Sequence, residues 1–175
     1  MYCIREIVLA IGNRILGVTL ILALIARTRN PDDSLESLCI SAFNMARYRL
    51  YLQKLYIPLI KDAIAHGLYV IVRPPGVCPQ DISVGDKYNR YLKSIWKTFA
   101  ADEYIQQNSG LISIELANEP VRVHLSDGSN SDKALHDYFQ PVVDEIRAQG
   151  FKGIIWVPGA GYQSQYQNYA KYPIT

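Results

Sequence analysis

Short apolar runs recur at equal intervals along the chain, and three of them follow a glycine, namely Gly67, Gly110 and Gly153. The runs are only a few residues long, rich in β-branched residues and bounded by glycine or proline, which is typical of strands buried in a parallel sheet. A fourth run of the same kind follows Gly17. The predicted strands cover residues 18–22, 68–72, 111–116 and 154–157.

Between these runs, apolar residues repeat at steps of three and four, which predicts amphipathic helices. Pro58 and Pro141 fall inside two of the patterns. Because proline lacks a backbone N–H, we expect each to kink its helix or to mark a later start. The predicted helices cover residues 52–64, 88–99 and 135–146.

The alternation of helices and strands predicts the fold class. A helix–strand unit repeated four times indicates an α/β fold with a parallel sheet and right-handed crossovers, either a barrel or a doubly wound sheet. A complete TIM (β/α)8 barrel takes about 250 residues, whereas this chain has 175. We therefore expect residues 1–175 to form a single domain that is a partial barrel, about half of the whole.

Composition narrows the possible functions. Hydrophobic residues make up 49% of the chain and charged residues 19%, as in an ordinary globular domain. The net charge of +2 comes without long basic runs, so a nucleic acid is not an expected partner. The three cysteines and three histidines lie far apart. We expect no metal site, no cofactor and no disulfide framework, and we interpret the thiols as free and structural.

The apolar run from Ile15 to Ala26 is flanked by arginines on both sides, a pattern that signal peptides share. The run is shorter than the roughly 20 residues of a membrane span. Leu24 is also a poor match to the small residue that a cleavage site requires. We interpret the run as part of the core, with no cleaved signal peptide and no membrane partner.

Candidate chemistry lies where the predicted strands end, because active sites of parallel barrels are built at the carboxyl ends of the strands. Glu119, in Asn118-Glu119-Pro120, comes directly after an apolar strand. A carboxyl group held against apolar walls has a raised pKa and can protonate a leaving oxygen near neutral pH. Asn118 offers amide donors and an acceptor to a sugar hydroxyl. The alternative interpretation is a plain strand-to-loop turn with a solvated Glu119.

The stretch 114–120 resembles the acid/base strand of glycoside hydrolase family 5, the family of cellulases and endo-β-1,4-glucanases. Further similarity covers residues 48–62, 67–76 and 94–96, within residues 17–172. The resemblance implies a secreted or extracellular enzyme that cleaves β-1,4-glucan by a retaining mechanism, with two carboxylates about 5–5.5 Å apart. It implies that Glu119 is the acid/base and that Asn118 binds the neighbouring sugar. The four predicted strands would be barrel strands two to five.

The chain departs from the family pattern in several places. The family's nucleophile is a glutamate on strand seven, and this sequence reaches Thr175 before strand six. The His-Tyr element of strand six and the tryptophan of strand eight also fall beyond it. An arginine usual near the end of strand two is missing, because residues 20–26 are wholly apolar. The nucleophile, and with it the retaining or inverting outcome, stays open.

Charged side chains on the strands have alternative interpretations. Glu115 has the same strand parity as Glu119, so both point to the same face. We favour a structural bridge between Arg73 and Glu115, with substrate contact by Arg73 as the second interpretation.

Aromatic and histidine side chains near the strand ends are candidates for sugar binding. Trp156 lies mid-strand, and a core position is favoured over substrate contact. Tyr162 and Tyr166 belong to a loop at the catalytic end, where their flat faces could stack on glucose rings. His124 lies five residues after Glu119, and sugar binding and simple solvation are equally compatible with that place.

These observations lead to three functional hypotheses. The first is a glycosidase whose half-barrels associate as a homodimer, burying the open face and edges of the sheet. The second is a carbohydrate-binding remnant of a cellulase that cleaves its glucan poorly or not at all. The third is a doubly wound sheet serving another small ligand, but no glycine-rich phosphate loop supports it.

Overall fold

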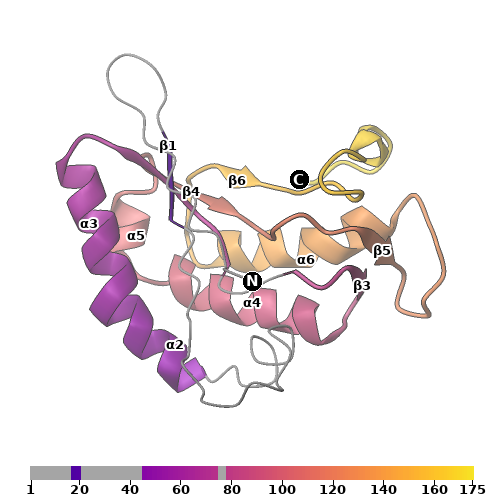
Figure 1. Cartoon of the computed structure of the whole chain (residues 1–175), viewed down its shortest axis with the longest axis horizontal. Coiled ribbons are helices and arrows are strands. Elements are labelled where there is room, and N and C mark those ends of the chain that lie inside the picture. Colours follow the sequence, from indigo (N-terminus) through magenta and orange to yellow (C-terminus); the bar gives the residue numbers. More distant parts are fainter. Residues whose placement is uncertain (1–16, 21–44, 75–77) are drawn as a thin grey trace, which may run out of the picture.

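The computed structural model describes residues 17–20, 45–74 and 78–175. Four strands form one parallel sheet in the order β1-β2-β4-β6 (Figure 1). They are β1 Gly17–Leu20, β2 Tyr69–Val72, β4 Ile112–Glu115 and β6 Ile155–Trp156. Each coincides with one of the apolar runs, so the predicted α/β class and parallel sheet are confirmed. Within the described residues the sheet stays open and does not close into a barrel.

The remainder of the N-terminal apolar run, residues 15–16 and 21–26, lies outside the described residues. Our interpretation of that run as core therefore stays a prediction. Of the helices that the structure describes, none is long and apolar enough to cross a membrane.

The first helical segment begins earlier than predicted and contains a π-helix. It runs from α2 (Met45–Tyr51) through the π-helix η1 (Leu52–Tyr56) into α3 (Ile57–Ala65). The wider turn closes with a hydrogen bond from the backbone N–H of Ile57 to the carbonyl oxygen of Leu52. Pro58 follows directly, in the first turn of α3, where a missing N–H is tolerated. Pro58 thus marks a change of helix type rather than a helix start.

Two further helices follow along the chain. Helix α4 (Lys87–Ala100) is capped by Asp86, whose carboxylate accepts a hydrogen bond from the Asn89 backbone N–H at 2.6 Å. Helix α6 (Ala134–Ala148) continues through Pro141, and it ends before Gly150, which has a left-handed backbone with φ 91°. A short helix, α5 (Glu103–Gln107), was not foreseen from the sequence.

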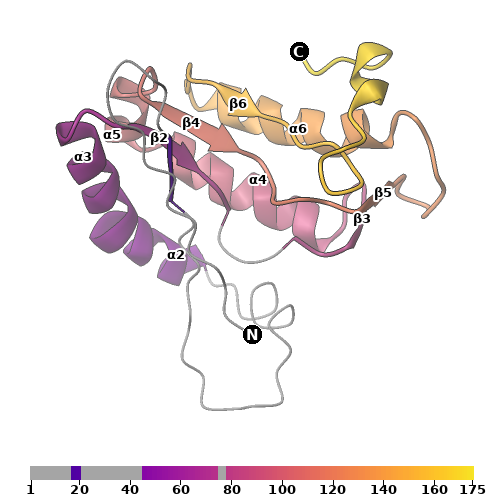
Figure 2. The same cartoon turned by 45° about the horizontal axis from the view of Figure 1, so that its top comes forward.

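The helices cover one face of the sheet. Figures 1 and 2 show α4 and α6 side by side beneath β4 and β6. The strand residues on this face alternate with less buried neighbours, as the pleat requires. The side chains that point into this core layer include Val70, Val72, Ile112, Ile114 and Leu116.

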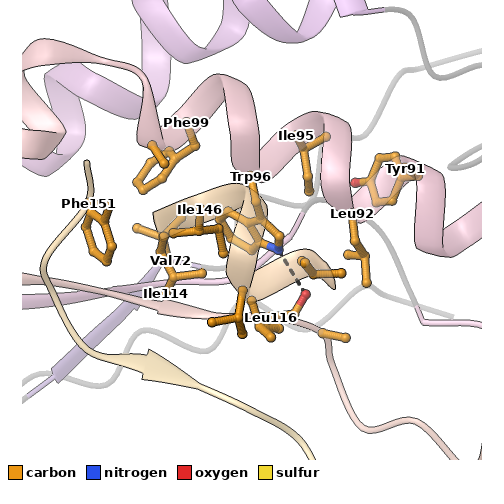
Figure 3. Close-up of a cluster of buried hydrophobic side chains, with 14 of the residues drawn as sticks. Val72, Tyr91, Leu92, Ile95, Trp96, Phe99, Ile114, Leu116, Ile146 and Phe151 are labelled. Carbon is orange, nitrogen blue, oxygen red and sulfur yellow. Dashed lines mark hydrogen bonds between the residues drawn. The ribbon is translucent and has the colours of Figure 1, made fainter. Parts of the chain in front are cut away.

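Figure 3 shows the centre of this core. Trp96 on α4 is almost fully buried, and its indole Nε1 donates a hydrogen bond to the carbonyl oxygen of Leu116 at 3.0 Å. Phe99, Ile146 and Phe151 pack around the same cluster. The end of β4 is therefore joined to the helical layer by apolar packing and by this hydrogen bond.

The opposite face of the sheet carries exposed apolar side chains. Tyr69, Ile154 and Trp156 are 53%, 61% and 50% exposed. Their parity is that of Glu115, opposite to the buried set. The expectation that Trp156 belongs to the core is wrong, because none of the described helices covers this face. The expectation of an open apolar face is confirmed.

A second, smaller sheet lies beside the first. It pairs β3 (Asp81–Ser83) with β5 (Arg122–His124) in parallel. Figure 2 shows it on the side toward the yellow C-terminal segment, which includes a 3-10 helix, η2 (Gln167–Ala170). The sequence did not predict these elements, because three residues are too few to show a period.

Candidate active site

The carboxyl ends of β2, β4 and β6 meet at one edge of the sheet, because the three strands are parallel neighbours. Arg73 follows β2, Asn118 and Glu119 follow β4, and the loop with Tyr162 follows β6. The structure therefore brings the predicted strand ends together. The side chains there divide into a carboxylate exposed at the rim, an ion pair on the open face, and a loop with two exposed tyrosines.

Glu119 is exposed at this rim, whereas Asn118 is half-buried. The backbone of Glu119 is left-handed, with φ 47°, a conformation that is uncommon for a residue with a Cβ atom and carries strain. Among the described residues, none donates a hydrogen bond to the Glu119 carboxylate and none forms an ion pair with it. The expected apolar enclosure of Glu119 is absent among the described residues, because the open face of the sheet leaves this rim uncovered.

The loop after β6 is hydrogen-bonded to the backbone that follows Glu119. The N–H of Tyr162 donates to the carbonyl oxygen of Pro120 at 3.2 Å, and that of Gly161 donates to Val121 at 2.9 Å. Tyr162 itself has a left-handed backbone, with φ 56°. The unusual conformations at Glu119 and in this loop thus occur where the two segments meet, as strained residues at functional sites often do.

The tyrosines of this loop point into solvent. Tyr162 is 63% exposed and Tyr166 66% exposed. The loop that carries them is itself ordered by mutual backbone hydrogen bonds between Ala160 and Gln165, at 3.0 and 2.9 Å. Tyr162 therefore combines an exposed aromatic ring with a fixed backbone next to Glu119.

Arg73 and Glu115 form the predicted ion pair, with Nε and Oε2 3.0 Å apart. The approach is poorly aligned for a hydrogen bond, so the contact is mainly electrostatic. The other oxygen of Glu115 accepts a hydrogen bond from the side-chain amide of Gln163 at 3.1 Å. Gln163 could not be predicted from the sequence, because it lies in a polar loop without periodicity.

A groove of about 280 Å³ lies on the open face beside this ion pair. The Trp156 indole forms one side, and its Nε1 donates a hydrogen bond to the Ser113 hydroxyl at 3.1 Å. Glu115, Gln163 and Pro158 line the rest together with Ile71 and Val157. A fixed indole face beside a carboxylate and an amide is an arrangement that can hold a sugar ring.

His124 lies on β5 within a polar cluster. Its Nδ1 is 2.9 Å from Asn130 Oδ1, and its Nε2 is 3.4 Å from Asp81 Oδ1. Asp81 also accepts hydrogen bonds from the guanidinium of Arg122. These bonds, above all that of Arg122, lower the pKa of Asp81 to about 2. His124 is thus held by partners of its own and makes no described contact with Glu119.

Among the described residues, no group of histidine, cysteine or acidic side chains has the arrangement of a metal site. Cys78 is buried as a free thiol, in line with the structural role predicted for it. Cys3 and Cys39 lie outside the described residues.

A family model for cellulases, glycosyl hydrolase family 5, matches residues 47–175. The match covers most of the chain. The chain belongs to glycosyl hydrolase family 5. Comparison with curated proteins finds no match.

Comparison with solved structures finds matches over part of this chain. A protein from Cytophaga hutchinsonii matches with a TM-score of 0.51 and 23% identity, over 71% of this chain and 38% of that protein. Cel5A (EG2) from Hypocrea jecorina (Trichoderma reesei) matches with a TM-score of 0.42 and 20% identity, over 62% of this chain and 31% of that one. A triple mutant of the endo-beta-1,4-glucanase from Xanthomonas axonopodis pv. citri matches with a TM-score of 0.42 and 20% identity, over 69% of this chain and 35% of that one.

This family 5 chain therefore spans well under half the length of the solved structures it matches. The open parallel sheet is part of a (β/α)8 barrel, as the sequence predicted. Glu119 follows β4, the strand that we matched to barrel strand four, by four residues.

Proposed function

We propose that this chain acts on β-1,4-glucan as a glycoside hydrolase, with Glu119 as the proton donor and the polysaccharide bound along the rim of the sheet. The observation that carries the proposal is the position of Glu119 at the carboxyl end of β4, in a chain of family 5. We propose that it acts outside the cell, as the resemblance implies.

The side chains near Glu119 have different proposed roles in substrate binding. Asn118, half-buried beside Glu119, presents its amide to a sugar hydroxyl. Trp156 and Tyr162 offer exposed aromatic faces to glucose rings. Arg73 acts mainly by holding Glu115, since its guanidinium already faces that carboxylate. His124 is a peripheral candidate for sugar binding, because both of its ring nitrogens already contact protein side chains, Asn130 and Asp81.

Proton donation by Glu119 requires an environment that the described residues do not supply. An acid that works near neutral pH needs a raised pKa, and burial without a compensating charge is what raises it. Glu119 is exposed here, so water must be excluded by the bound glucan or by an added protein surface. We therefore expect catalysis only when the bound glucan or an added protein surface covers the rim and excludes water from Glu119.

We propose that a second copy of the chain provides this cover. The strands of the sheet are all parallel, with β1 and β6 on its two sides. A two-fold axis along the strand direction would place β6 of each copy next to β1 of the other, giving eight parallel strands with the exposed Tyr69, Ile154 and Trp156 inside. Size-exclusion chromatography with light scattering tests this: a stable monomer at micromolar concentration contradicts the dimer.

The geometry of the dimer would also determine whether hydrolysis retains or inverts the configuration of the anomeric carbon. Two copies of Glu119 would face each other across one cavity. Carboxyl groups about 5–5.5 Å apart support a retaining mechanism, whereas about 6.5–9.5 Å leaves room for the attacking water of an inverting one. Hydrolysis followed by NMR of the newly formed anomer distinguishes the two outcomes.

A carbohydrate-binding remnant is the second candidate function. On the open face, the carboxylate nearest to Glu119 in the sequence is that of Glu115. It already forms an ion pair with Arg73 and accepts a hydrogen bond from Gln163. It is therefore poorly suited to attack a sugar as a nucleophile. If Glu119, the one free carboxylate at the rim among the described residues, has no second carboxylate to work with, the chain would bind glucan and release it uncut.

Hydrolysis of carboxymethylcellulose separates the two functions. We expect the wild type to release reducing ends and Glu119→Gln to lose at least about a hundredfold in kcat, because general acid catalysis contributes at least that much. Glu103→Gln is the matched control, an exposed carboxylate on α5 in the helical layer. Activity that survives in Glu119→Gln removes Glu119 from the mechanism, and glucan binding without turnover in the wild type supports the remnant.

A further inference from the structure

A second groove, of about 320 Å³, lies between β5, the start of α6 and the loop that follows β6. It is separate from the groove beside Trp156, and none of the residues predicted from the sequence to bind substrate lines it. Its base is apolar and includes Val123, Leu135 and Ala160. Its rim carries side-chain amides, those of Asn130, Gln165 and Asn168.

The amides at the rim have hydrogen-bonding capacity to spare. Gln165 and Asn168 bond to described residues only through their backbone. The Oδ1 atom of Asn130 contacts His124 at 2.9 Å, which leaves its amide N–H groups unused among the described residues. Each carboxamide can donate and accept at the same time, so the rim suits a ligand with several hydroxyl groups.

The charges around the groove are already paired. The guanidinium of Arg122 is held by both carboxylate oxygens of Asp81. Asp132 lies 3.6 Å from the ammonium group of Lys171. Because neither sign of charge is left in excess, the groove favours a neutral ligand over a phosphate or a cation. A pyranose ring, apolar on its C–H face and polar around its edge, fits an apolar base with a rim of amides.

The groove is connected to the candidate active site by backbone. Val121, two residues after Glu119, lines the groove and accepts the hydrogen bond from the N–H of Gly161. Ala160 and Gln165, which also line it, are joined by two backbone hydrogen bonds. The strand and loop that hold Glu119 in place therefore also form two walls of the groove.

We propose that this groove is a second carbohydrate-binding site, which takes a glucosyl unit of the polysaccharide held at Glu119. The proposal rests on the proposed function for its choice of sugar. Tyr162 is exposed and its backbone is hydrogen-bonded to Pro120, so its ring offers the glucan an aromatic surface on the loop whose residues Ala160 and Gln165 line the groove. The groove would hold the polysaccharide whether or not the bond at Glu119 is cut.

NMR titration of the full ¹⁵N-labelled chain with cellotetraose tests the proposal. We expect the side-chain amide signals of Asn130, Gln165 and Asn168 to shift in the wild type and in Glu119→Gln alike. The double variant Gln165→Ala, Asn168→Ala should bind about tenfold more weakly, having lost two hydrogen-bonding groups. Gln107→Ala, which removes an exposed amide from α5, is the matched control and should bind as the wild type does.

The outcomes separate the two proposals. Groove signals that stay unshifted at saturating cellotetraose overturn the second site, even if carboxymethylcellulose is hydrolysed. Unchanged affinity in a double variant that keeps the wild-type amide spectrum elsewhere overturns it as well. Groove shifts in a chain without hydrolytic activity support the second site while the hydrolase proposal fails.

Discussion

The indole Nε1 of Trp96 donates a hydrogen bond to the carbonyl oxygen of Leu116, 3.0 Å away. Trp96 belongs to α4 in the core, and Leu116 lies between the end of β4 and Glu119. The bond crosses from the helical layer to the sheet (Figure 3). The position of the candidate acid therefore depends on a buried side chain that no substrate can touch.

Replacing Trp96 with phenylalanine should destabilise the fold. The smaller ring leaves the Leu116 carbonyl without its donor and creates a small cavity, which together cost about 1–3 kcal/mol. Chemical denaturation measures the free energy of unfolding. Trp156→Phe is the control, and should cost less than about 1 kcal/mol because Trp156 is half-exposed. Equal losses in both variants would contradict the role given to Trp96.

Alanine at Gly159 should distort the loop that carries Tyr162. An added Cβ atom would lie 2.7 Å from the carbonyl oxygen of Gln165, which is too close. We expect faster amide hydrogen exchange at Ala160 and Gln165 and a loss of about 1–3 kcal/mol in stability. Gly110→Ala is the matched control, since no atom lies within 4 Å of its added Cβ. Unchanged exchange in Gly159→Ala would show that the loop adapts.

The ion pair of Asp81 should make stability depend on pH in the acid range. Hydrogen bonds, chiefly from Arg122, lower the pKa of Asp81 to about 2 in the folded chain, against about 3.9 when unfolded. The stabilisation is complete above about pH 4 and disappears as the pH falls toward 2. Melting temperatures of wild type and Asp81→Asn should therefore converge over this range. A gap of constant size would contradict the lowered pKa.

The thiol of Cys78 should resist alkylation in the folded chain. Burial raises its pKa from 9.0 to about 12, which reduces the reactive thiolate at pH 8 by roughly a thousandfold. Iodoacetamide labelling, followed by mass spectrometry of the peptide that contains Cys78, measures the rate. The unfolded chain is the control and should react at the ordinary rate. Rapid labelling of the folded chain would contradict the burial of this thiol.

The sequence predicted the strands well because their apolar runs are long enough to show a pattern. The second sheet escaped prediction because β3 and β5 have three residues each. The helix before β2 was predicted to start at residue 52, whereas it starts at Met45 with a π-helix before Pro58. The periodicity of apolar residues predicts whether a segment is a helix or a strand better than it predicts the residues at which the segment begins and ends.

The candidate site was predicted in part. Asn118-Glu119-Pro120 was recognised by its place after a strand, and the Arg73–Glu115 pair by strand parity and charge. The exposure of Glu119 and Trp156 could not be predicted, because burial depends on what covers each side chain in the folded protein. Gln163 was missed because its bond to Glu115 joins residues far apart in the chain.

The loop after β6 is hydrogen-bonded to the segment just beyond Glu119 through the peptide groups of Gly161 and Tyr162. The phenol ring of Tyr162 takes no part in these bonds. Under the proposed function, exchanging that ring for other side chains would leave Glu119 where it is while altering which sugars are preferred. Position 162 is accordingly a place where an engineer, or natural variation, would change selectivity without moving the proposed proton donor.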